Sequence, residues 1–401
     1  MTKTFSIAPG LIWTGDINHR PEVQDGFDRT RTVRFYDTTL RDGEQAVGVV
    51  FSADAKYEIA RQLNELGIGR IESGFPRVSD EDTEAVRRIL AADFQSEIWG
   101  FSRAVKADID AHIALGTQAV LIEIAASEAK IKAYGFTRET VIARLSEAIQ
   151  HACAHGMRVN FFPVDSTRAD LEFLEQVYRA AIDAGAAEVS VVDTIGACAP
   201  EAVEFLIRQV ARWVGPEVPI HWHGHNDFGL ATAAAIAAVR GGATWIQGTI
   251  NGMGERAGNA DICEVALALQ CLYNVPVEMD LTKARRVSET VRQAGGYTLD
   301  RWKPVVGEAL FVRESGAVAA QFHMPDAIEP YASEVVAAQR GIVLGKKSGL
   351  ANIEIKLREL GIALAEDQLP PLLLKVKKLS TEARRLVTND EFRELVASLR
   401  G

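Results

Sequence analysis

Three histidines occupy alternate positions in the segment Ile220–Asp227, which reads IHWHGHND. In a β-strand alternate side chains share a face, so the three imidazoles would point the same way. His223 and His225, nearest the carboxyl end of the strand, could then bind one divalent cation together. A lone histidine on an apolar strand is more often bonded to a backbone carbonyl, but two neighbouring buried imidazoles need a partner that satisfies both. The spacing therefore predicts a metal site.

Asp42 and Arg41 stand together shortly after the apolar segment Val33–Asp37. Asp42 would add one hard oxygen ligand to the two imidazole nitrogens, a set that fits Mn²⁺, Zn²⁺, Co²⁺ or Mg²⁺. Such an ion could act as a Lewis acid on a 2-oxo acid bound through its carboxylate and keto oxygens. Arg41 could offer its guanidinium to an oxygen that gains enolate charge, and Glu72 could hold the arginine in place.

The elements that would position these residues recur as eight pairs of an apolar strand and a helical pattern. The helix expected at Ala53–Leu66 has its apolar residues on one face. Eight alternating units imply a parallel sheet that closes into a (β/α)8 TIM barrel, an α/β fold. A doubly wound open sheet is the alternative, but the Gly-rich turn that normally follows its first strand is missing. The predicted strands lie near Val33–Asp37, Arg70–Phe75, Glu97–Phe101, Ala119–Ile124, Val159–Pro163, Glu188–Val192, Ile220–His225 and Thr244–Ile250.

Polar residues follow several of the predicted strands, at the end of a TIM barrel where active sites lie. Arg41 and Asp42 follow the first strand, Glu72 falls in the second, and the segment Asn251–Asn259 follows the eighth. Each charged residue taken alone is better explained by a position in a loop or by a salt bridge at the mouth of the barrel. Their convergence on one face predicts an active site instead.

The strand and helix rhythm stops after about residue 275. The sequence therefore predicts three parts: an irregular N-terminal arm over 1–31, the TIM-barrel catalytic domain over 32–275, and a linker with a small, mostly helical domain over 276–401. Helical patterns in the last part lie at Thr282–Ala294, Ser348–Leu360, Leu369–Ser380 and Asp390–Leu399.

Composition narrows the classes of partner. The net charge of −10 argues against nucleic-acid binding, which would need a basic face. No apolar run approaches the ~18 residues of a membrane span, and the N-terminus lacks the pattern of a secretory signal. We therefore expect a soluble, cytoplasmic protein with small-molecule substrates.

Three motifs resemble the metal-dependent TIM-barrel family of homocitrate, 2-isopropylmalate and citramalate synthases and 3-hydroxy-3-methylglutaryl-CoA lyase. They are DTTLRDGEQ at Asp37–Gln45, HGHND at His223–Asp227 and GERAGN at Gly254–Asn259. The resemblance covers nearly the whole chain, and it implies condensation of an acyl-CoA, typically acetyl-CoA, with a 2-oxo acid. The helical tail, with its LGKKSG run, looks like the small domain that the synthases carry and the lyase lacks, which favours condensation over cleavage.

The resemblance also implies roles for eight residues. The divalent metal ligands map onto Asp42, His223, His225 and, as a weaker fourth, Asn259. The catalytic arginine and its carboxylate partner map onto Arg41 and Glu72. Two further positions near the oxo-acid substrate are matched by Gln45 and Thr194. The synthases often complete one site with a segment from a partner subunit, so a homodimer is expected.

Two positions depart from the family pattern. Val164 stands where the synthases usually have a glutamate that touches the oxo acid. The histidine-containing segment after the barrel, F-x-H-x-x-G-x-H, is replaced by FVRESGAV at Phe311–Val318. Either another group takes the acyl-CoA proton, the candidates being Glu314, His323 and Glu123, or the donor or reaction differs.

Three functions therefore remain open. The first is a Claisen-type acyltransferase that joins an acyl-CoA to a 2-oxo acid. The second is a carbon–carbon lyase or aldolase on the same metal scaffold. The third is a non-catalytic paralogue that binds metal and ligand without turnover.

Overall fold

The structure is a computed structural model that describes residues 5–400, so the first four residues of the predicted N-terminal arm lie outside it. The described chain forms two compact units. One comprises Gly15–Leu299 with residues 5–6, and the other comprises Ile7–Thr14 with residues 300–400. The unit that holds the barrel thus continues past residue 275 to Leu299, and a short piece of the N-terminal arm belongs to the second unit.

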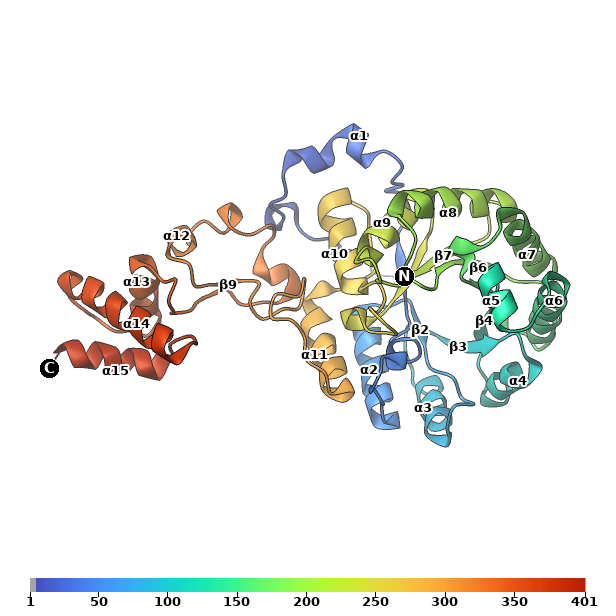
Figure 1. The fold of residues 1–401 in the computed structure, drawn as a ribbon, viewed down its shortest axis with the longest axis horizontal. Helices are drawn as coiled ribbons and strands as arrows, with labels where there is room; N and C mark the ends of the chain where they lie inside the picture. The colour runs from blue at the N-terminus through green and yellow to red at the C-terminus, as the bar shows by residue number, and fades with distance from the viewer. Residues whose placement is uncertain (1–4, 401) are drawn as a thin grey trace. The chain divides into compact units, whose positions relative to one another are not determined.

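The larger unit is a closed barrel of eight parallel strands in sequential order, β1 to β8, with β8 returning to pair with β1 (Figure 1). The predicted TIM-barrel fold is confirmed. The second strand ends at Glu72 rather than at the predicted Phe75, because Gly74 turns the backbone at a φ of 125°. The strands are β1 Arg34–Asp37, β2 Arg70–Glu72, β3 Glu97–Arg103, β4 Ala119–Ala125, β5 Arg158–Val164, β6 Glu188–Asp193, β7 Ile220–Gly224 and β8 Trp245–Gly248.

Helices surround this barrel and begin and end at recognisable capping residues. Helix α2 starts after Ser52, whose hydroxyl accepts from the Ala55 amide, and it stops at Gly67, whose φ of 93° suits glycine. The helices of this unit are α1 Pro21–Gln24, α2 Ala53–Leu66, α3 Asp80–Leu90, α4 Lys106–Leu115, α5 Glu128–Ala133, α6 Arg138–Ala154, α7 Leu171–Asp183, α8 Pro200–Val214, α9 Ala231–Gly241, α10 Ile262–Tyr273 and α11 Ala284–Gly295. The predicted helix at Ala53–Leu66 matches α2 at both ends.

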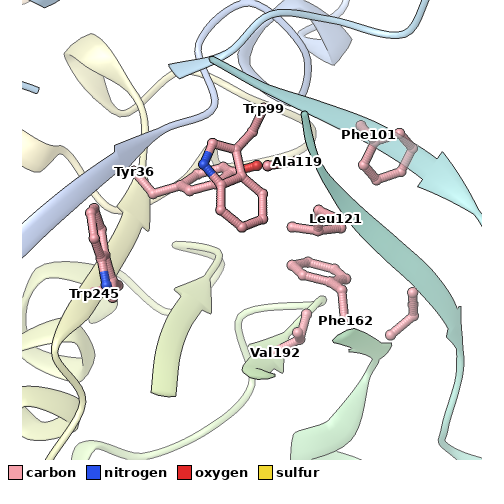
Figure 2. Close-up of a cluster of buried hydrophobic side chains, with 9 residues drawn as sticks. Tyr36, Trp99, Phe101, Ala119, Leu121, Phe162, Val192 and Trp245 are labelled. Carbon is pink, nitrogen blue, oxygen red and sulfur yellow. The ribbon is translucent and has the colours of Figure 1, made fainter. Parts of the chain in front are cut away.

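Side chains from alternate strand positions fill the interior of the barrel. Figure 2 shows a cluster of them, in which Trp99 and Phe101 of β3 lie with Leu121 of β4 and Phe162 of β5. Below this cluster, toward the amino ends of the strands, Arg70 bonds Glu188, and the guanidinium of Arg70 lies 3.7 Å from the ring centroid of Trp245. The interior is therefore a packed core, and substrates have access only at the ends of the strands.

The second unit has its own small core. Its helices are α12 Gly316–Ala319, α13 Leu350–Glu359, α14 Leu369–Ala383 and α15 Asn389–Arg400, and its strands β9 Val312–Arg313 and β10 Gly341–Ile342 pair in parallel. Ile353, Leu372 and Phe392 come from three of these helices and are fully buried together. The helical tail that the sequence predicted is therefore present.

Within residues 5–400, no helix combines the length and the apolar character that a membrane span requires.

Candidate active site at the carboxyl ends of the strands

The turn after β1 brings Arg41 and Asp42 to the mouth of the barrel. The amides of Arg41 and Gly43 both donate to the carbonyl of Thr38, at 3.1 and 3.0 Å. The buried carboxylate of Asp37 accepts from the amide and the hydroxyl of Thr39, at 2.8 and 2.9 Å. These bonds fix a tight turn, so the directions of Arg41 and Asp42 are set by the backbone.

Asp42, His223 and His225 form a buried cluster at this mouth. The Nε2 atoms of both histidines lie 3.6 Å from Oδ2 of Asp42. Ligand atoms of the three residues all lie within 4.8 Å of one another. His223 belongs to β7, and His225 follows the strand in a bridge with Asn259. The alternation of the histidines along an extended segment therefore does put two of them on one centre.

Burial and neighbouring charges keep the three residues of the cluster in the protonation states that a bound cation needs. Burial is the largest influence on the pKa of Asp42 and would raise it, but the Arg41 charge, the two imidazoles and the Asn259 amide lower it to about 2. Burial lowers the pKa of His223 to about 3, and it lowers the pKa of His225 as well. At neutral pH the cluster thus offers one carboxylate and two neutral imidazoles, which is a donor set for a divalent metal ion.

Arg41 is held by two carboxylates and one aromatic ring. Its Nε donates to Glu72 at 2.6 Å, and an Nη donates to Asp42 at 3.2 Å. Its guanidinium carbon lies 4.2 Å from the ring centroid of Phe101. Glu72 is fully buried at the end of β2, and burial raises its pKa against the opposing charge of Arg41. The guanidinium therefore sits beside the cluster in one fixed orientation.

Of the other predicted site residues, Asn259 contacts this cluster directly, whereas Thr194 and Gln45 form no hydrogen bond with Asp42, His223 or His225 within the described residues. Asn259 donates to Oδ2 of Asp42 at 2.7 Å and to the carbonyl of Met253 at 3.1 Å. The hydroxyl of Thr194, just after β6, accepts from the Asp165 amide at 2.8 Å. Gln45 is exposed on the 3-10 helix Gly43–Gln45. In this structure Asn259 orients the carboxylate of Asp42 and leaves its own buried Oδ1 without a hydrogen bond inside the described chain.

His221 is the histidine of the segment that does not reach the centre. Its Nε2 lies 2.7 Å from Oε2 of Glu188, and its ring stacks on Trp245 at a centroid distance of 5.6 Å. It belongs to the interior of the barrel, one step lower along β7, as the spacing of the three histidines implied.

Two supports of the site were not recognised from the sequence. Phe101 lies under the guanidinium of Arg41, and Phe162 packs edge-on against His223 with centroids 5.1 Å apart. Both occupy inward positions of the barrel, on β3 and β5. Strand alternation would have identified them as inward-facing, but only the packed barrel shows which polar group each ring contacts.

Comparison with known proteins identifies the family to which a chain with this site belongs. Residues 32–291 match the HMGL-like family. The probable 2-isopropylmalate synthase of Methanopyrus kandleri is 40% identical over 88% of this chain and 70% of its own length. The homocitrate synthase AksA of Methanothermobacter thermautotrophicus is 38% identical over 92% of this chain and 94% of its own length.

Among solved structures, the HMG-CoA lyase of Bacillus subtilis superposes with a TM-score of 0.61 at 19% identity, covering 68% of this chain and 96% of the lyase. That likeness supports the barrel fold alone. The match of the family to the barrel and the near full-length similarity to the two synthases confirm the resemblance drawn from the three motifs. The chain is therefore a member of the HMGL-like family.

Proposed function

We propose that this protein catalyses the metal-dependent condensation of an acyl-CoA, with acetyl-CoA as the first candidate, with a 2-oxo acid. One observation carries the proposal: a buried cluster of one carboxylate and two imidazoles lies beside a fixed guanidinium at the barrel mouth. The chain is also similar to synthases over about nine-tenths of its length, including the second unit. This extent favours condensation over the lyase reaction.

Asp42, His223 and His225 are the proposed metal ligands, with Asn259 in support. Two imidazoles and a single carboxylate favour Mn²⁺, Zn²⁺ or Co²⁺ over Mg²⁺, which prefers oxygen ligands. When bound, the ion supplies Lewis-acid polarisation of the keto group of the 2-oxo acid. Asn259 keeps the carboxylate of Asp42 aimed at the two histidines through its bond of 2.7 Å.

Arg41 is the proposed electrostatic catalyst. Its guanidinium stabilises oxygen atoms that gain negative charge as the acyl enolate forms and attacks. Glu72 holds that group by a bond of 2.6 Å and cannot swing away, because it is fully buried. Thr194 and Gln45 are assigned to the binding of the oxo acid at the rim of the site.

Val164 gives one wall of the site an apolar surface. It is 8% exposed and packs in the cluster with Phe101 and Phe162. An acceptor with an uncharged side chain suits this wall best, because a carboxylate placed against it would lose its hydration without a partner.

The protein is also proposed to act as a homodimer. The apolar residues at 309–312 and 317–320 motivate this proposal, since several of them stay half-buried or exposed in the second unit. Light scattering at low micromolar concentration should report at least a dimer, and a monomer alone would contradict the proposal.

A panel of 2-oxo acids tests the reaction. Each acid is incubated with acetyl-CoA and a divalent metal, and free thiol is measured; release that needs both the acid and the metal is the expected result. The panel should include 2-oxoglutarate, 2-oxoisovalerate, pyruvate and acids with larger uncharged side chains. Cleavage of a 3-hydroxyacyl-CoA without any thiol release from acetyl-CoA would replace this proposal with the lyase. Inertness in both assays would favour a non-catalytic paralogue.

A further inference from the structure

We propose that Glu123 is a catalytic residue of this site, whose carboxylate removes the proton from the acyl carbon of the thioester. The inference rests on the proposed function and deepens it, because it assigns a base to a step for which the metal cluster and Arg41 offer none. It is drawn from the position of Glu123, from its surroundings and from its lack of a partner.

Glu123 lies on the inner face of β4, near the carboxyl end of the strand. On one side it is in register with Arg103 of β3 and on the other with Phe162 of β5. Phe162 packs against His223 at 5.1 Å. Leu121, two residues earlier on the same face, is buried among the cluster that includes Phe101, on which Arg41 rests. Glu123 therefore points into the barrel at the level of Phe162, close to the carboxyl end of β4.

A pocket of about 220 Å³ opens beside Glu123. Apolar, aromatic and cationic side chains line it, which suits a thioester methyl group and its carbonyl. The lining residues are Arg103, Ala104, Val105, Glu123, Ile124, Ala125, Tyr134, Phe136, Arg144 and Val164. Desolvation of a carboxylate in such a pocket strengthens it as a base, because water no longer stabilises its charge.

Other carboxylates at this end of the barrel are already engaged. Asp193 accepts from Thr167 and from the amides of residues 197 and 198, and Asp165 accepts from Ser127 and Arg168. Asp227 is held by Arg256 at 2.9 Å, and Glu72 by Arg41. Within residues 5–400, the carboxylate of Glu123 accepts no hydrogen bond and forms no ion pair. A base needs a lone pair that no other group of the protein occupies, and among the described residues the carboxylate of Glu123 meets this condition.

The electrostatic setting supports this role. Burial is the largest influence and raises the pKa of Glu123 to about 7, with Glu72 and Asp42 adding to the rise. Arg41 and Arg103 oppose the rise. A carboxyl poised near neutral pH can accept a proton in one step and return it in the next.

The proposed step balances without a further reagent except water. The carboxylate takes a proton from the carbon next to the thioester carbonyl, which leaves an enolate and a carboxylic acid. The enolate carbon forms a bond to the keto carbon of the oxo acid, and the keto oxygen, now an alkoxide, takes the proton back from Glu123. Water then cleaves the thioester, which gives a carboxylate, the free thiol of CoA and one proton that passes to solvent.

The test compares Glu123→Gln with the matched control Glu128→Gln, whose carboxylate lies nearby on α5, is exposed and pairs with Arg138. Loss of a general base typically costs ~10²–10⁴-fold, so we expect kcat of Glu123→Gln to fall at least ~10²-fold with little change in KM. The acidic limb of the pH–rate profile near neutrality should disappear with it. The metal affinity and the melting temperature of Glu123→Gln should stay close to those of the wild type, and so should the activity of Glu128→Gln. A Glu123→Gln enzyme within threefold of wild-type kcat would overturn the assignment.

Proton exchange separates this inference from the proposed function. Acetyl-CoA is incubated with the metal-loaded protein in D₂O, and deuterium entry into its methyl group is followed by mass spectrometry. If the wild type releases no thiol with any oxo acid, the proposed function fails. Deuterium exchange that is present in the wild type and absent in Glu123→Gln would still support Glu123 as the base. No exchange in the wild type would overturn the assignment of Glu123.

If Glu123→Gln does not fold, Glu123→Asp decides the matter, since it retains the carboxylate at a shorter reach. A loss of ~10-fold or more in kcat with the acidic limb retained would support the role. Unchanged kcat would contradict it.

Discussion

The barrel contains two layers of charged side chains that have nearly the same residue types but differ in how their polar atoms are paired. In the lower layer Arg70 bonds Glu188 at 2.9 Å and His221 bonds the same carboxylate at 2.7 Å. In the upper layer Arg41 bonds Glu72, while His223 and His225 stand 3.6 Å from the carboxylate of Asp42. Each layer thus combines an arginine, buried carboxylates and histidine.

The difference lies in which atoms already have partners. The guanidinium of Arg70 is stacked on Trp245 and bonded on its edges, so every charge of the lower layer is satisfied inside the barrel. The upper layer leaves imidazole nitrogens facing one another across a carboxylate and leaves Glu123 without a partner in the described chain. Buried polar groups without partners cost free energy, so the Nδ1 atoms of His223 and His225, which have no partner in the described chain, indicate function, whereas the ion pairs of Glu188 with Arg70 and His221 indicate structure.

The largest expected effect is the loss of metal binding when a histidine of the upper layer, but not of the lower layer, is replaced. His223→Ala removes a proposed ligand, so we expect loss of the bound metal and a fall of at least ~10³-fold in thiol release, because a Lewis acid contributes several kcal/mol. His221→Ala is the matched variant in the lower layer and should keep its metal. Calorimetric titration of both variants checks this. Unchanged stoichiometry and affinity in His223→Ala would remove that residue from the metal site.

The second expected effect is on stability and belongs to the lower layer. Arg70→Met leaves Glu188 and His221 without their buried cation, which should cost roughly 3–5 kcal/mol in the free energy of unfolding. Arg179→Met is the control, since that side chain is 55% exposed and pairs with Glu175 on the same helix, so its loss should cost less than about 1 kcal/mol. Denaturant titration measures both. Equal losses would show that the lower layer is not the tightly coupled network that its contacts imply.

The third effect concerns catalysis by the upper layer. Arg41→Lys retains the charge but loses the fork that Glu72 and Asp42 hold, so we expect kcat to fall ~10²-fold with little change in KM. Steady-state kinetics across the accepted oxo acids measure this. A change in KM alone would mean that Arg41 binds the substrate equally in the ground state and the transition state.

The smallest effect is a pH dependence of the lower layer. Burial would raise the pKa of Glu188, but the hydrogen bond from His221 and the charge of Arg70 lower it to about 2. Because the folded pKa lies below the ordinary value of 4.5, Glu188 stabilises the fold fully above pH 4.5 and loses that contribution as the pH falls toward 2. The difference in unfolding free energy between wild type and Glu188→Gln should therefore shrink by about 2 kcal/mol over this range. Denaturation in EDTA at stepped pH measures it, and a constant difference would contradict the assignment.

The barrel and the residues of the central cluster follow from local patterns in the sequence. Eight strand and helix periods require a closed parallel sheet, and helix α2 matched its predicted limits because its caps, Ser52 and Gly67, are local signals. Alternation along Ile220–Asp227 placed His223 and His225 on one face, since the period of a strand is two residues. The turn that carries Arg41 and Asp42 was likewise predictable from the short motif at Asp37–Gln45.

Which polar groups are paired and which are free depends on the packing of the folded chain. The sequence offered Glu123, Glu314 and His323 as candidate bases and could not rank them. Nor could it separate Glu123 from Asp165 and Asp193, which also lie near the carboxyl ends of strands. Closure of the barrel gave the two aspartates hydroxyl donors from distant parts of the chain, Ser127 for Asp165 and Thr167 for Asp193, in addition to the local donors that each already had. It left Glu123 facing a pocket. Hydrogen-bond satisfaction depends on groups far apart in the chain, so it emerges from packing and not from local pattern.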